Sequence, residues 1–207
     1  MSNMKLWNSV CVTDPKAVKA ITGKQYKGNS PKPYWIIQRA TETFGPCGIG
    51  WGIEVVSERF ERFGDEALHV AMVRVWYEIY GRRGIIEQMG QTKAAYTSAA
   101  GKYIVDEDAP KKSVTDGMVK CLSMLGFAGD IFSGQWDDSA YVQWAGAETE
   151  RRENPVDYFK AIANAKDIAA LKAHFSAAWK MSDEATQKEL KAAYDKRTEQ
   201  LTQKETA

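Results

Sequence analysis

The sequence has few of the residues that form disulfides and zinc sites, and it has no long apolar run. Its 207 residues include three cysteines and two histidines. The three cysteines, Cys11, Cys47 and Cys121, are odd in number and far apart, which argues against a disulfide framework. The sequence has no Cys-x-x-Cys or His-x-x-x-His pair, so it does not predict a zinc site. No run of about 18 apolar residues occurs, and residues 1–12 lack the apolar segment of a signal peptide. We therefore expect a cytoplasmic protein with no metal and no membrane contact.

An excess of charge of one sign is also missing. The chain has 28 basic and 27 acidic residues, a net charge of +1. The charge is nevertheless unevenly distributed, because residues 1–33 carry six lysines against Asp14 alone, whereas residues 34–150 carry −6 and residues 151–207 carry +2. Any surface that binds an anion must therefore be local.

Enzyme signatures are absent. Gly23-Lys24 is not a P-loop, because the motif needs a glycine five residues earlier and Ser or Thr after the lysine. Gly48-x-Gly50-x-Gly52 lacks the spacing of a dinucleotide-binding turn. Asp106-Glu-Asp108 lacks the spacing of an EF-hand and is better explained as the start of a helix. We therefore expect no enzyme activity and no cofactor.

What the sequence does contain is a pattern of strands followed by a long helix. Pro33 begins a helix that ends at Gly45-Pro46. Three strands of an antiparallel meander follow, joined at Gly81–Gly84 and predicted over Ile53–Phe60, Leu68–Tyr80 and Ile85–Thr92. A helix then runs to about Leu125, with a buried stripe of Val114, Met118, Cys121, Leu122 and Leu125.

This order predicts the α+β class, with a β-β-β-α core in which the meander packs on the long helix. Gly117, inside that helix, predicts a close contact with the sheet, because an interior glycine costs about 1 kcal/mol relative to alanine. Residues 1–33 form a basic arm with a short helix over Pro15–Ile21, residues 34–150 form the core with Gln135–Gly146 as a connector, and residues 151–207 form a C-terminal helical region. Its three helices are expected to start near Asn154-Pro155, Asp167 and Ser182.

Basic side chains beside aromatic ones suit single-stranded nucleic acid, since cations contact phosphates and rings stack on bases. Solvated surface charge and core aromatics remain the simpler explanation for each residue taken singly. The candidate DNA-binding residues lie on the long helix, on the meander, on the first helix and on the basic arm. They are Lys111, Lys112, Lys120, Arg74, Trp76, Arg82, Arg83, Lys93, Lys102, Arg39, Lys24 and Lys27.

Two segments resemble the Rad-fifty-two-like single-strand annealing proteins, a grouping with the phage recombinases of the Sak, Erf, RecT and Redβ types. Ala40-Thr-Glu-Thr-Phe-Gly45, followed by Gly50-Trp51 and an extended Ile53–Val56, resembles their first helix and first strand. The stretch from Lys111 to Gly126, with Val-Thr-Asp-Gly and a trailing Leu-Gly, resembles their long helix. The similarity covers about residues 31–134 and includes Gly90 near the end of the meander.

The resemblance implies ATP-independent annealing of complementary strands in homologous recombination, ring or helical homo-oligomers, and a DNA groove between the meander and the long helix. Lys111 and Lys120 match basic positions of the family helix. Val119 and Ser123 stand where eukaryotic members have further basic residues, and Trp35 stands where they have an arginine. The binding surface is therefore not a copy of the family's.

Other functions remain open at this point. A passive single-stranded-DNA-binding protein would share the affinity without bringing two strands together. A phage structural or assembly protein would oligomerise without nucleic-acid affinity, and a nuclease is disfavoured by the missing carboxylate cluster. The C-terminal helices either recruit a protein, such as a host single-strand-binding protein or a phage exonuclease, or pack on the core and stabilise it.

Overall fold

The computed structural model describes residues 4–21, 27–153, 157–180, 182 and 184–205. The chain is α+β, as predicted, and divides into two compact units, Met1–Thr149 and Glu150–Ala207. Within the described residues, no helix has both the length and the apolar composition needed to cross a membrane.

The first unit begins with α1 (Lys5–Val10) and a 3₁₀ turn, η1 (Pro15–Ala17). The helix predicted over Pro15–Ile21 is wrong beyond Ala17. The Asp14 carboxylate accepts a hydrogen bond from the backbone N–H of Lys16 at 2.8 Å and so caps only this short turn.

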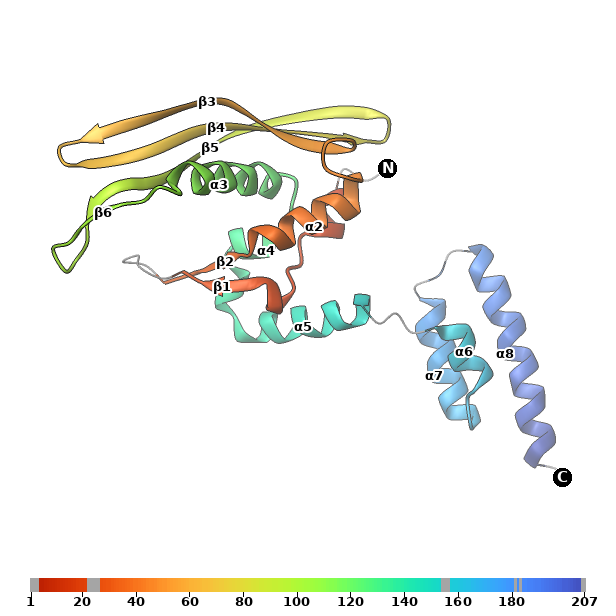
Figure 1. The fold of residues 1–207 in the computed structure, drawn as a ribbon. Helices are drawn as coiled ribbons and strands as arrows, with labels where there is room; N and C mark the ends of the chain where they lie inside the picture. Colours follow the sequence, from red (N-terminus) through yellow and green to blue (C-terminus); the bar gives the residue numbers. More distant parts are fainter. Residues whose placement is uncertain (1–3, 22–26, 154–156, 181, 183, 206–207) are drawn as a thin grey trace. The chain divides into compact units, whose positions relative to one another are not determined.

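A two-stranded antiparallel hairpin lies within the predicted basic arm, residues 1–33. Its strands are β1 (Val18–Ala20) and β2 (Asn29–Pro31). Ile21 N–H extends the ladder by donating to the Gly28 carbonyl oxygen at 2.9 Å. The backbone at the end of the predicted helix is therefore used for strand pairing (Figure 1).

Four antiparallel strands, in the order β3-β4-β5-β6, form the main sheet (Figure 1). The predicted meander is confirmed, and its strands are longer than the sequence pattern indicates: β3 (Trp51–Phe63), β4 (Glu66–Ile79) and β5 (Arg82–Thr97). The added strand, β6 (Tyr103–Val105), has three residues, which is too short to show an alternating pattern.

The turn between β4 and β5 is tighter than predicted. Tyr80 and Gly81 form it with φ angles of 54° and 70°, the positive values that a two-residue hairpin turn requires. Since Glu78 pairs with Arg83 and Ile79 with Arg82, both arginines belong to β5 rather than to a loop.

The helix α3 (Ala109–Ser123) packs on β4 and β5 (Figure 1). The contact is made by a stripe of small side chains. Ser113 Oγ donates to the His69 carbonyl oxygen at 3.1 Å. Cys121 Sγ lies 3.4 Å from the Val73 carbonyl oxygen and 3.5 Å from that of Ile86, and burial raises the pKa of its thiol. The side of α3 that faces the sheet has a small buried residue at every fourth position: Ala109, Ser113, Gly117 and Cys121.

The closest approach between helix and sheet is at two glycines. A Cβ atom on Gly90 of β5 would lie 1.9 Å from the Ser113 carbonyl oxygen and 2.4 Å from the Gly117 nitrogen. A Cβ atom on Gly117 would lie 2.6 Å from Cγ2 of Val73. The predicted close contact at Gly117 is therefore confirmed, and no side chain fits at either position without displacing the helix.

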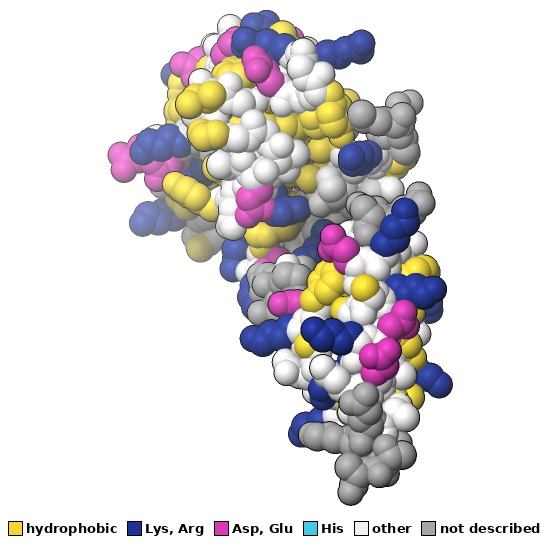
Figure 2. All heavy atoms as spheres, turned by 90° about the vertical axis from the view of Figure 1, so that its right-hand side faces the viewer, with side chains coloured by type: hydrophobic (Ala, Val, Ile, Leu, Met, Phe, Trp, Pro, Cys, Tyr) yellow, Lys and Arg dark blue, Asp and Glu magenta, His cyan; other side chains and the backbone are white. Residues whose placement is uncertain are grey.

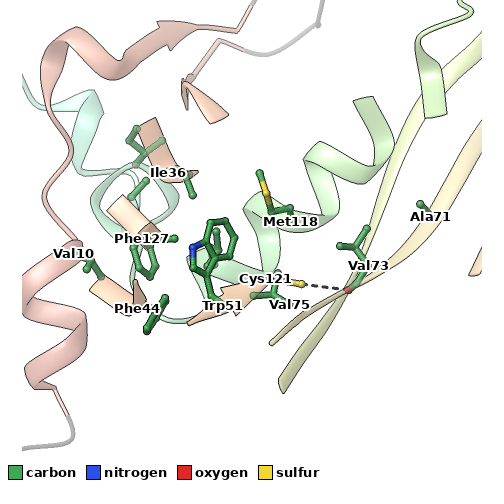
Figure 3. Packing of buried hydrophobic residues seen from close by; sticks show 14 residues of the cluster. Val10, Ile36, Phe44, Trp51, Ala71, Val73, Val75, Met118, Cys121 and Phe127 are labelled. Carbon is green, nitrogen blue, oxygen red and sulfur yellow. Dashed lines mark hydrogen bonds between the residues drawn. The ribbon is translucent and has the colours of Figure 1, made fainter. Parts of the chain in front are cut away.

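The hydrophobic core lies where α2 (Pro33–Phe44), the start of β3, β4 and α3 meet (Figure 3). The Phe44 ring centroid lies 5.1 Å from that of Tyr77 and 5.8 Å from that of Phe127. Met118 and Leu122 are buried, as predicted, whereas Val114 and Leu125 are only partly buried. The fully buried large side chains of this cluster include Ile36, Trp51, Val73, Val75, Leu122 and Phe127.

A buried carboxylate ties the N-terminal segment to the region after α3. Asp130 lies in α4 (Gly129–Phe132) and is 2% exposed. It accepts hydrogen bonds from Thr13 N at 2.8 Å, Thr13 Oγ1 at 2.6 Å, Trp136 Nε1 at 2.9 Å and Tyr141 Oη at 3.1 Å. A buried charge needs such donors to replace its hydration, so this network fixes the chain that leads into the hairpin.

The segment Gln135–Gly146, predicted as a connector, contains helical structure. It forms a 3₁₀ turn, η2 (Gln135–Asp137), and the first half of α5 (Ser139–Glu153). The Asp138 carboxylate accepts a hydrogen bond from Ala140 N–H at 2.8 Å and so satisfies one of the free donors at the helix start.

The second unit is a set of three helices, α6 (Tyr158–Ala163), α7 (Ile168–Trp179) and α8 (Glu184–Glu205). Asp167 caps α7 as predicted, by accepting from Ala170 N–H at 2.7 Å. Asp157, rather than Asn154, caps α6, and the predicted start at Asn154-Pro155 lies outside the described residues. Ser182 Oγ donates to the Ala178 carbonyl oxygen instead of capping α8, which begins at Glu184. The second unit has a hydrophobic core of its own, separate from that of the first unit. It contains Ile162, Ala165, Leu171, Ala178, Leu190 and Leu201.

Replacing Gly117 by alanine should destabilise the first unit by about 1–3 kcal/mol, because the new methyl group overpacks the contact with Val73 and Gly90. Gly146→Ala is the matched control. Gly146 also lies inside a helix, but its nearest atom to a Cβ is Pro15 Cγ at 3.6 Å, an ordinary contact. The control should be neutral or more stable, since alanine favours helix. Equal melting temperatures for Gly117→Ala and the wild type in thermal denaturation would contradict the packing argument.

Candidate nucleic-acid interface

An open pocket of about 490 Å³ lies between the β1–β2 hairpin, the start of α2 and the exposed side of α3. We call it the α3 groove. Lysine side chains line two of its walls: Lys19 lies on the hairpin, and Lys111 and Lys112 lie on the helix. The residues that line it are Lys19, Ser30, Pro31, Pro33, Asp108, Lys111, Lys112, Thr115, Asp116 and Val119.

The two helix lysines form exposed ion pairs at the base of α3. Lys111 Nζ lies 2.9 Å from Asp108 Oδ1, and Lys112 Nζ lies 2.6 Å from Asp106 Oδ2. The hydrogen bond from Lys111 lowers the pKa of the Asp108 carboxyl group, and the hydrogen bond to Asp106 raises the pKa of Lys112. Solvent-exposed pairs of this kind contribute little to stability.

Lys19 was not among the predicted site residues. It is exposed on β1 and makes no ion pair with any residue in the described part of the chain. The cluster of lysines in the first 33 residues was the available signal. That cluster could single out Lys19 only together with the hairpin pairing, which brings Lys19 opposite Ser30.

Lys120, the third predicted lysine of α3, lies outside the groove lining. Its Nζ atom lies 3.0 Å from Asp116 Oδ2, and the same carboxylate oxygen accepts from Gln91 N–H of β5 at 3.2 Å. Asp116, itself a lining residue of the α3 groove, therefore links Lys120 to β5.

Arg74 and Trp76 lie on the opposite face of the sheet from α3. Val73 contacts Gly117 of α3, and successive side chains of a strand alternate between faces. Arg74 bonds Glu87 and Glu54, with N–O distances of 2.6 Å and 3.0 Å in the two ion pairs, and these hydrogen bonds raise the pKa of Arg74. Its charge is therefore compensated by two carboxylates.

The remaining candidates are dispersed over the first unit. The Arg83 guanidinium lies 4.3 Å from the centroid of the Trp76 ring, and Lys93 pairs with Glu66 at 3.0 Å. Arg39 of α2 bonds Glu42 and donates to the Ser9 carbonyl oxygen at 3.0 Å.

Three of the last four candidates lie among the described residues. Arg82 begins β5 next to the hairpin turn, and Lys102 lies in the loop before β6. Lys27 is exposed, and Lys24 lies outside the described residues. The structure thus brings Lys111 and Lys112 together with the unpredicted Lys19 and places Arg82 and Arg83 in a separate pocket. It does not collect the eleven described candidates on one surface.

The groove contains no set of metal ligands. Across the residues that the structure describes, no three His, Cys, Asp or Glu side chains are grouped so that they could hold a metal ion. The chemistry available in the α3 groove is binding by lysine ammonium groups, two carboxylates, two hydroxyl groups and apolar surface.

Comparison with known proteins finds no family model and no curated protein that matches this chain.

Proposed function

We propose that the chain binds single-stranded DNA in the α3 groove and anneals complementary strands without ATP, in homologous recombination of the phage type. The observation that carries the proposal is the meeting of Lys19 with Lys111 and Lys112 across an open groove. Ammonium groups on two walls suit a phosphate backbone that runs between them. An antiparallel meander followed by the long helix α3 supports the proposal, because the resemblance implies a meander packed on a long helix; the structure adds β6 between the two.

The mechanism is physical. Lysines hold the phosphates of one strand, and the bases of that strand are left accessible to a second strand. Base pairing and stacking in the new duplex supply the free energy, so no nucleotide, metal ligand or catalytic base is needed. Binding through phosphates is tolerant of sequence and weakened by salt.

Charge reversal in the groove tests the binding site. Lys111→Glu with Lys112→Glu should lower the affinity for a labelled oligonucleotide about tenfold or more, because a hydrogen bond to a charged group contributes about 1.5–3 kcal/mol. The slope of log K against log salt should fall by about 0.7 for each lost phosphate contact. Lys19→Glu, on the other wall, should also weaken binding, and fluorescence anisotropy measures all three effects.

The control is Lys172→Glu with Lys180→Glu, which changes the net charge equally at two exposed lysines of the second unit. This variant should bind like the wild type. Equal losses in the groove and control variants would indicate a general charge effect and would contradict a site in the groove.

We further propose that the chain forms homo-oligomers, in rings or helical filaments, through the β3 edge of the sheet. Within the described residues, β3 pairs along its length only with β4, and an unpaired strand edge is a template for another chain. Ile53 and Val55 of β3 are 40% and 47% exposed. Hydrophobic side chains also reach the surface among charged ones on the face drawn in Figure 2.

Light scattering at micromolar concentration tests this assembly. The wild type should have a mass of several chains, and Ile53→Lys with Val55→Lys should shift it toward one chain, since each lysine places a charge at the edge. Phe132→Lys, at an exposed apolar side chain of α4, should leave the mass unchanged. A wild type that is monomeric with and without single-stranded DNA would refute the oligomer.

The second unit is proposed to recruit a protein, with a host single-strand-binding protein or a phage exonuclease as the candidate partners. Its own hydrophobic core makes it separable from the groove. A chain ending at Glu153, the last residue of α5, should fold and bind single-stranded DNA within about threefold of the full chain, because every lining residue of the groove is retained. Loss of folding or of all binding would show instead that residues after 153 support the first unit.

A further inference from the structure

An exposed aromatic ring stands beside the α3 groove. Tyr34 is 84% exposed, the highest value among the large hydrophobic side chains in the described part of the chain. It lies in the first turn of α2, where Pro33 precedes it. Ile36 of the same turn is fully buried, and Trp35 and Ile37 pack against the core. The backbone that carries Tyr34 is therefore fixed while its ring faces solvent.

The ring borders a second hollow, of about 460 Å³. Lys32 lies in this hollow and its Nζ atom donates to the Lys16 carbonyl oxygen at 2.8 Å. An ammonium group has three N–H donors, so Lys32 retains donors for a phosphate oxygen. The hollow is lined by Asp14, Lys16, Ala17, Lys32, Tyr34, Trp35, Ile37 and Gln38.

The two hollows adjoin at three consecutive residues. Pro33 lines the α3 groove, while Lys32 and Tyr34, on either side of it, line the second hollow. A strand that leaves Lys111 along the groove past Pro33 therefore meets a lysine and an exposed ring together. Aromatic rings beside cations are the features that hold unpaired bases in single-stranded-DNA sites.

We infer that the hollow at Tyr34 is a nucleobase site in which the Tyr34 ring stacks on one base of the bound strand while Lys32 contacts the adjoining phosphate. The inference rests on the proposed function and adds to it a position where the protein holds a base rather than the backbone. Because every base has a π-face, the site takes any of the four bases.

Substitutions at Tyr34 separate stacking from other roles. Tyr34→Ala should lower the affinity for a labelled oligonucleotide about 5- to 100-fold, the range for loss of one stacked base. Tyr34→Phe should stay within about twofold of the wild type, since the ring is kept. Phe132→Ala, which removes an exposed ring on α4, is the control and should bind like the wild type.

An abasic oligonucleotide tests base stacking directly. If Tyr34 had only a structural role, its substitution would not change the difference in affinity between intact and abasic oligonucleotides. The wild type should bind an oligonucleotide with several abasic positions more weakly than the intact one, and Tyr34→Ala should reduce this difference. Photo-crosslinking to an oligonucleotide that carries 5-iododeoxyuridine should label Tyr34 or Trp35 in the tryptic digest.

The outcomes distinguish this inference from the function beneath it. If the wild type binds single-stranded DNA, but Tyr34→Ala binds equally well and keeps the full abasic difference, the base site is wrong and the groove stands. If the wild type binds no single-stranded DNA, both are overturned. A smaller mass of Tyr34→Ala in light scattering would assign the ring to a subunit contact and would also overturn the base site.

Discussion

The contact between Gly90 and Gly117 is the constraint on which the first unit depends. Two backbones approach so closely there that a Cβ atom on either residue would overlap the opposite element. The contact fixes α3 on the sheet both along its axis and in rotation, because Ser113 and Cys121, one turn away on each side, bond to the same strands. With these small residues turned to the sheet, Lys111 and Lys112 line the groove on the side of the hairpin.

The other wall of the groove depends on a different interaction. Asp130 draws Thr13, Trp136 and Tyr141 onto one buried carboxylate. Thr13 directly precedes the Asp14 turn that leads into β1, so this network places the strand that carries Lys19. The glycine contact and the Asp130 network, both buried, thus set the distance between Lys19 on one wall and Lys111 and Lys112 on the other. The three lysines themselves are exposed.

Periodic patterns in the sequence predicted most of the first unit and little of its candidate binding surface. The alternation from Leu68 to Tyr80 and the apolar spacing of Met118 and Leu122 reflect burial, so β4 and α3 could be located. The small-residue stripe that includes Ser113 and Gly117 was missed as a whole, because small side chains contribute little to an apolar pattern. The site could be predicted only in part, since Lys111 and Lys112 are local to one helix, whereas Lys19 reaches the groove through hairpin pairing that no local pattern indicates.

Annealing itself is tested most directly by mixing two complementary oligonucleotides, labelled as a fluorescence-transfer pair, with the protein and without ATP. The proposed function predicts faster duplex formation than for the oligonucleotides alone, and loss of this acceleration in the Lys111→Glu, Lys112→Glu variant. Strands that are bound but pair no faster would contradict annealing and leave a passive single-stranded-DNA-binding protein. Neither binding nor acceleration would contradict the nucleic-acid function of the groove altogether.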